Sequence, residues 1–72
     1  MITTTDPYAA LRGEIRRLRA RLTRAVNDLH NLIAAARATL AAQRDGEDDP
    51  LYYLRDELRA QGQLPDDYPD QP

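Results

Sequence analysis

The side chains with the clearest chemical potential are arginines crowded into a 13-residue stretch. They are Arg12, Arg16, Arg17, Arg19, Arg21 and Arg24. Glu14 is the single acid among them, so the stretch carries a net charge of +5. Guanidinium groups bind phosphates and carboxylates with two hydrogen bonds, and a helix fits the major groove of DNA. The stretch therefore predicts contact with nucleic acid or with an acidic partner, while a solvated helix face is the simpler alternative.

The arginine count by itself is weaker evidence. All ten basic residues are arginine and none is lysine. Such a bias suits phosphate or carboxylate binding, but it is also typical of a GC-rich genome. On composition alone we expect a small protein of a GC-rich bacterium or of its phage.

Residues that support catalysis or metal binding are scarce. Serine and cysteine are absent, and His30 has alanine, not a second ligand, four residues later. Asp56 and Glu57 are neighbours on a predicted helix, where their side chains diverge by about 100°. The sequence therefore predicts a protein that is not an enzyme, with no catalytic residues, no cofactor and no metal site.

The arginines lie on a segment whose apolar residues recur at steps of three and four. The series is Tyr8, Leu11, Ile15, Leu18, Leu22, Ala25, Leu29, Leu32 and Ala36. This spacing predicts one long amphipathic helix with a coiled-coil-like seam along one edge.

Helix boundaries follow from capping residues. Asp6-Pro7 is a strong start, because a carboxylate can cap the helix and proline suits its first position. Gly46 suits the left-handed geometry that ends a helix, and Asp49-Pro50 repeats the start. The predicted organisation is all-α, with a lead-in at 1–6, a helical hairpin at 7–62 (helix 7–44, turn 45–49, helix 50–61) and a disordered acidic Pro-rich tail at 63–72.

The two predicted helix starts also resemble each other. Residues 6–16 align with residues 49–59, matching at Asp, Pro, Leu, Arg, Glu and the final Arg. One interpretation is that both segments present one surface to the same kind of partner. The other is that two amphipathic helices beginning with Asp-Pro converge on similar patterns.

Heptad positions divide the apolar residues between two roles. The association seam is assigned to Leu11, Ile15, Leu18, Leu22, Leu29 and Leu32. The e positions turn from arginine to apolar along the helix, which predicts a wider face there for the short helix to cover. Packing within the hairpin is assigned to Val26, Ile33, Leu40, Leu51, Leu54 and Leu58.

Size and charge indicate how such a chain acts. A hairpin of 72 residues without cysteine buries too little apolar area to offset the entropy of ordering it, which favours self-association. Residues 1–44 carry a net +5 and residues 45–72 a net −7. Parallel, antiparallel and four-helix arrangements all remain open.

The functional expectation is a non-enzymatic adaptor or regulatory protein. It acts as a homo-oligomer, a dimer as first guess, or by binding a partner helix. The alternative is a small nucleic-acid-binding regulator that uses the arginines at 12–24. Residues 1–6 have no signal-peptide character and no apolar run is long enough to span a bilayer, so we expect a soluble cytoplasmic protein without membrane association.

Overall fold

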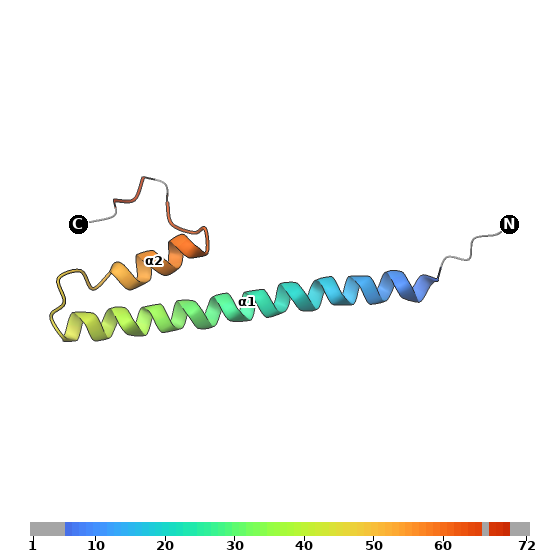
Figure 1. Ribbon diagram of the computed structural model, residues 1–72, viewed down its shortest axis with the longest axis horizontal. Helices are drawn as coiled ribbons and strands as arrows, with labels where there is room; N and C mark the ends of the chain where they lie inside the picture. Colours follow the sequence, from blue (N-terminus) through green and yellow to red (C-terminus); the bar gives the residue numbers. More distant parts are fainter. Residues whose placement is uncertain (1–5, 66, 70–72) are drawn as a thin grey trace.

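The computed structural model describes residues 6–65 and 67–69, which form two helices. α1 spans Pro7–Arg44 and α2 spans Tyr52–Ala60 (Figure 1). No strand occurs in these described ranges, and the two helices contact each other, so the predicted all-α class is confirmed. The sequence analysis placed the long helix at 7–44 and the short helix at 50–61.

Both ends of α1 are held by local hydrogen bonds. The Asp6 carboxylate accepts from the Tyr8 backbone N–H at 2.9 Å, and Pro7 occupies the first turn, where no N–H is required. At the other end Gly46 has a φ of 74°, and the Glu47 N–H donates to the Ala42 carbonyl at 2.9 Å. This is the glycine-dependent termination expected for a helix that must stop and turn.

α2 is shorter than the sequence predicted. Pro50 and Leu51 form a turn, and the Tyr52 N–H donates to the Asp49 backbone carbonyl at 3.1 Å. Asp49 does not cap α2 through its side chain, unlike Asp6 at the start of α1. At the C-terminal end Gly62 has a φ of 70°, and the Gln63 N–H reaches the Leu58 carbonyl at 2.8 Å.

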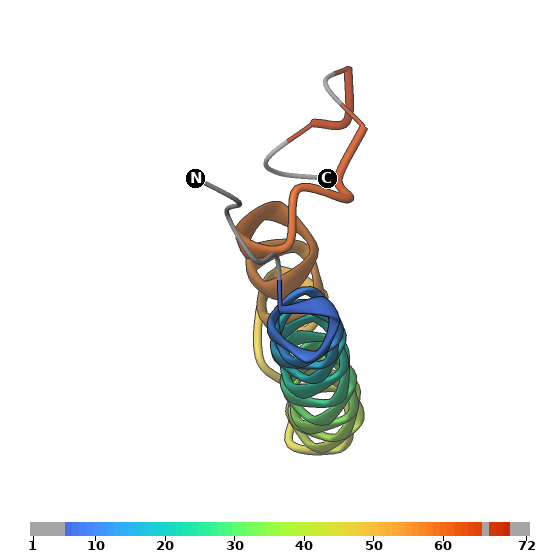
Figure 2. The same cartoon turned by 90° about the vertical axis from the view of Figure 1, so that its right-hand side faces the viewer.

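After the turn, α2 runs back beside the C-terminal half of α1, while the N-terminal half of α1 stands alone (Figures 1 and 2). The Cα radius of gyration is 20.3 Å. A compact chain of this length would have about 11 Å. The chain is therefore a rod with a short second layer at one end.

The contact between the helices is made largely by small side chains of α1. The half-buried or buried residues on this part of α1 are Asp28, Leu32, Ala35, Ala36, Ala38, Thr39, Ala41 and Ala42. Ala42 is the one fully buried apolar residue among the described residues. The Gln61 side-chain amide donates to the Asp28 backbone carbonyl at 2.7 Å, which anchors the C-terminal end of α2 on α1.

The described part of the tail lies against α2. Leu64, Pro65 and Tyr68 join the α2 side chains of Leu54 and Leu58 in lining a mostly apolar groove of about 170 Å³. The predicted disordered tail at 63–72 is described only at 63–65 and 67–69, and the lead-in only at Asp6. Residues 1–5, 66 and 70–72 lie outside the described residues.

Candidate association surface

Large apolar side chains line one face of α1 from end to end without a cover. We call them the apolar stripe: Tyr8, Leu11, Ile15, Leu18, Leu22, Val26, Leu29, Ile33 and Leu40. Each is between 40% and 67% exposed. A continuous row of exposed large apolar side chains is typical of surfaces that contact another molecule. Of the residues assigned to the association seam, Leu32 is the exception, because it is half-buried beside α2.

The hairpin buries a different row of α1 from the one the sequence analysis assigned to it. Val26, Ile33 and Leu40 remain exposed, whereas Ala35 and Thr39 are half-buried. Ile33 and Ala35 point about 160° apart on a helix. Small side chains let the backbone of α2 approach closely, so the alanine-rich row accepts α2 and the larger side chains stay outside.

On α2, the three leucines assigned to hairpin packing are divided. Leu54 and Leu58 are half-buried, while Leu51 is 46% exposed. Leu51 lies in the turn that precedes α2 and not within the helix. The short helix therefore uses the pair spaced four residues apart, together with Gln61, to hold its position.

The arginine stretch lies on the half of α1 that has no neighbouring helix. Arg12 pairs with Asp6 at 3.0 Å and Arg17 with Glu14 at 2.6 Å. The other four predicted contact residues are exposed and form no ion pair with any described residue: Arg16, Arg19, Arg21 and Arg24.

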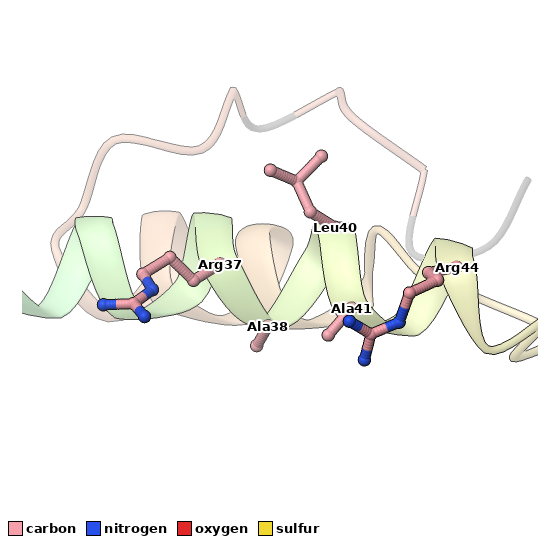
Figure 3. A pocket seen from close by; sticks show the side chains of 5 residues that line it. All are labelled: Arg37, Ala38, Leu40, Ala41 and Arg44. Atoms are coloured by element: carbon pink, nitrogen blue, oxygen red, sulfur yellow. The ribbon is translucent and has the colours of Figure 1, made fainter.

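The arginines continue beyond this stretch at the other end of α1. Arg37 and Arg44 line an open depression together with Leu40, Ala38 and Ala41, and Leu40 points away from Ala38 (Figure 3). Arg44 also contacts the Asp45 carboxylate at 3.1 Å. The apolar stripe is thus bordered by guanidinium groups along much of its length.

A buried ion pair fixes the turn to α2, and the sequence analysis did not assign it. Arg55 is buried and donates to both carboxylate oxygens of Asp49, one contact measuring 3.1 Å. Asp6 and Arg12 form the same pair at the start of α1, also six residues apart, but on the surface. The resemblance between the two helix starts contained this signal, since Asp-Pro followed by Arg recurs in both.

A second contact ties the turn to the first residues of α2. The Tyr53 hydroxyl donates to Glu47 Oε1 at 2.9 Å, and the Tyr52 and Tyr53 rings meet edge to face with centroids 5.6 Å apart. The hydrogen bond to Glu47, followed by the charge of that carboxylate, raises the pKa of Tyr53 above its ordinary value of 10.0.

Two classes of site find no support within the described ranges. They contain no helix both long enough and apolar enough to cross a membrane. They also contain no group of three or more His, Cys, Asp or Glu side chains suited to a metal ion.

The fold and its surface define a small all-α protein in which a short helix is docked on one end of a long, amphipathic one. The chain matches no known protein family, and no curated protein or solved structure is significantly similar to it.

Proposed function

We propose that this chain is a non-enzymatic helical interaction protein that works by self-association, or by binding a partner helix, through the apolar stripe. The observation that carries the proposal is the exposure of the stripe while α2 occupies a separate row of the same helix. Burying one leucine side chain contributes about 2 kcal/mol, so a face with several is strongly favoured to find a cover.

The stripe supports association better than any internal rearrangement does. α2 has nine residues against 38 in α1, so it can cover only a fraction of the stripe wherever it docks. Among the described residues, α2 is the only other helix, and it lies beside the C-terminal half of α1, not beside its N-terminal half (Figure 1). A second molecule is the remaining source of a cover.

The test is the mass of the protein in solution across micromolar concentrations, measured by sedimentation or light scattering. We expect an oligomer for the unmodified chain and a monomer for Leu22→Asp. Ala20→Asp is the matched control, because it introduces the same charge two residues away on the opposite face. Losing two leucines from a dimer, at about 2 kcal/mol each, weakens association roughly 1,000-fold.

A monomeric unmodified chain at the highest concentration would rule out self-association and leave a partner helix as the cover. An oligomer that persists in Leu22→Asp would show that the stripe is not the contact surface. Circular dichroism of each variant verifies that α1 is still helical.

A second candidate function, nucleic-acid binding, is favoured by the arginines at 16, 19, 21 and 24 that form no ion pair with described residues. Guanidinium groups on an exposed helix could release about five counterions from duplex DNA, which predicts a log–log salt slope near −4.5. Binding that is absent at low salt would eliminate this candidate. Association through the stripe and phosphate contact through the arginines use different side chains, so one chain can do both.

A further inference from the structure

Together with Ala36, a half-buried residue on the same edge of α1, the apolar stripe contains the same pattern twice. The side chains at Tyr8, Leu11, Ile15, Leu18 and Leu22 are followed, each 18 residues later, by Val26, Leu29, Ile33, Ala36 and Leu40. Eighteen residues make five complete turns of an α-helix, so corresponding residues point in the same direction. The two halves of α1 therefore present equivalent faces, one with arginines and the other with α2 beside it.

Resting on the proposed function, we infer that the stripe is covered by a second copy of this chain running antiparallel, with the two-fold axis near Thr23 and Arg24. When the second copy runs antiparallel, each residue in the first half of the pattern lies opposite a residue in the second half of the pattern in the other copy. The facing pairs are Tyr8 with Leu40, Leu11 with Ala36, Ile15 with Ile33, Leu18 with Leu29 and Leu22 with Val26. Corresponding levels agree to within about one residue, or 1.5 Å.

Side-chain volumes favour this direction over a parallel one. Ala36 is the small member of the pattern, and antiparallel pairing sets it against Leu11 at both ends of the dimer. Parallel pairing sets Ala36 against its own copy, which leaves a void between the helices, and voids in a packed interface reduce stability. A parallel pair would also place the two Tyr8 side chains against each other.

Charge favours the same direction. A parallel pair would hold two segments of net charge +5 side by side, and also two segments of −7. An antiparallel pair separates the two arginine stretches and sets each beside residues 24–36 and α2 of the other copy, whose charged residues balance to zero. Like charges held in proximity are destabilising, whereas opposite ones favour and orient the encounter.

Charge also selects the register of the antiparallel pair. With the axis near residue 24, exposed Arg21 lies at the level of Asp28 in the other copy, about 2 Å away along the helix axis, although Asp28 is half-buried in the row beside α2. Sliding the pair by one heptad would instead set Arg21 level with Arg21, or Asp28 level with Asp28. Only the central register aligns opposite charges and keeps every level of the stripe covered.

α2 does not obstruct this pairing. It covers the row that contains Ala35 and Thr39, whereas Leu40, the next residue after Thr39, is 65% exposed. Consecutive residues on a helix diverge by about 100°, so the docked helix and the second copy occupy different sides of α1. In an antiparallel pair both α2 helices lie on the same side of the two long helices.

Disulfide trapping distinguishes the directions, and the chain has no cysteine of its own to interfere. Leu11→Cys and Ala36→Cys are made as separate chains and oxidised alone and after mixing. A disulfide needs Cβ atoms within about 4 Å of each other. In the antiparallel pair two copies of position 11 are roughly 38 Å apart, since about 25 residues at 1.5 Å separate their levels.

We expect no cross-link in either pool alone and a cross-linked dimer with one chain of each kind in the mixture. Ala20→Cys, on the opposite face, is the matched control and should not cross-link. Cross-linking of Leu11→Cys with itself would overturn the antiparallel direction, and a reduced dimer that cross-links in no pool would overturn the register. A monomer by sedimentation in the reduced state would instead refute the proposed self-association, so the two failures are told apart.

Discussion

The ion pair between Asp49 and Arg55 provides the sharpest test of how α2 is held. The Arg55 side chain is 7% exposed and that of Asp49 is 32% exposed, whereas the values for Arg12 and Asp6 are 63% and 50%. The two pairs have the same residue types and spacing. They differ in burial and in contacts, since Arg55 donates to both Asp49 oxygens and Arg12 to one of Asp6. Asp49→Asn and Asp6→Asn are therefore matched substitutions that remove one carboxylate charge each.

Burial sets the expected size of the two effects. A charged hydrogen-bonded pair contributes about 1.5–3 kcal/mol when shielded from water, and the partial exposure of Asp49 places its value near 2 kcal/mol. The exposed pair at the start of α1 contributes less than about 0.5 kcal/mol. Asparagine retains the helix cap at residue 6, so that substitution isolates the charge.

Hydrogen exchange measures docking of α2 separately from the helicity of α1. A loss of about 2 kcal/mol corresponds to roughly 30-fold more frequent opening. We expect the amides of α2 to exchange roughly 30-fold faster in Asp49→Asn, with those of residues 12–24 unchanged. In Asp6→Asn neither set should change more than about twofold. Equal effects from the two substitutions would refute the argument from burial.

Four further predictions follow from single positions. Gly13→Ala should stabilise α1 by about 1 kcal/mol in thermal unfolding, because alanine has a higher helix propensity than glycine. The added Cβ is tolerated, since its nearest neighbour, the end of the Arg17 side chain, lies 3.7 Å away. Gly46→Ala should destabilise the chain by about 1 kcal/mol in the same measurement, since its φ of 74° strains any side chain. Thr39→Val should stabilise α2 docking by about 1 kcal/mol in urea unfolding, because the Thr39 Oγ1 is buried with no hydrogen-bond partner among the described residues. Glu47→Gln should lower the pKa of Tyr53 toward 10.0 in an ultraviolet titration; in the unmodified chain the hydrogen bond is intact below that pH and is lost as the pH rises through the raised pKa.

The features that could be predicted from sequence are those governed by neighbouring residues. Asp6, Pro7 and Gly46 act within one turn of the helix ends, and α1 begins and ends beside them. The amphipathic spacing is equally local, and it indicated a long helix with one apolar edge. The all-α class follows from these two facts.

The side of α1 that α2 covers could not be predicted in the same way. Val26, Ile33 and Leu40 were assigned to the hairpin because the e positions turn from arginine to apolar there, which predicted a wider apolar face. In the structure Ala35 is half-buried and Ala42 is buried, while Val26, Ile33 and Leu40 are exposed, so the row with short side chains lies beside α2. Docking between two helices depends on which surfaces fit at short distance, and a list of hydrophobic positions does not contain that information.

The separation of these two rows of α1 has a thermodynamic consequence. The row of α1 beside α2 is mostly small side chains, while the exposed large side chains of the stripe lie on another row, which under the proposed function makes the association contact. Free-energy changes at separate, non-contacting sites are generally additive within about 0.5 kcal/mol. Docking of α2 and pairing of α1 are therefore expected to vary independently, so that a chain can lose its partner and retain its fold.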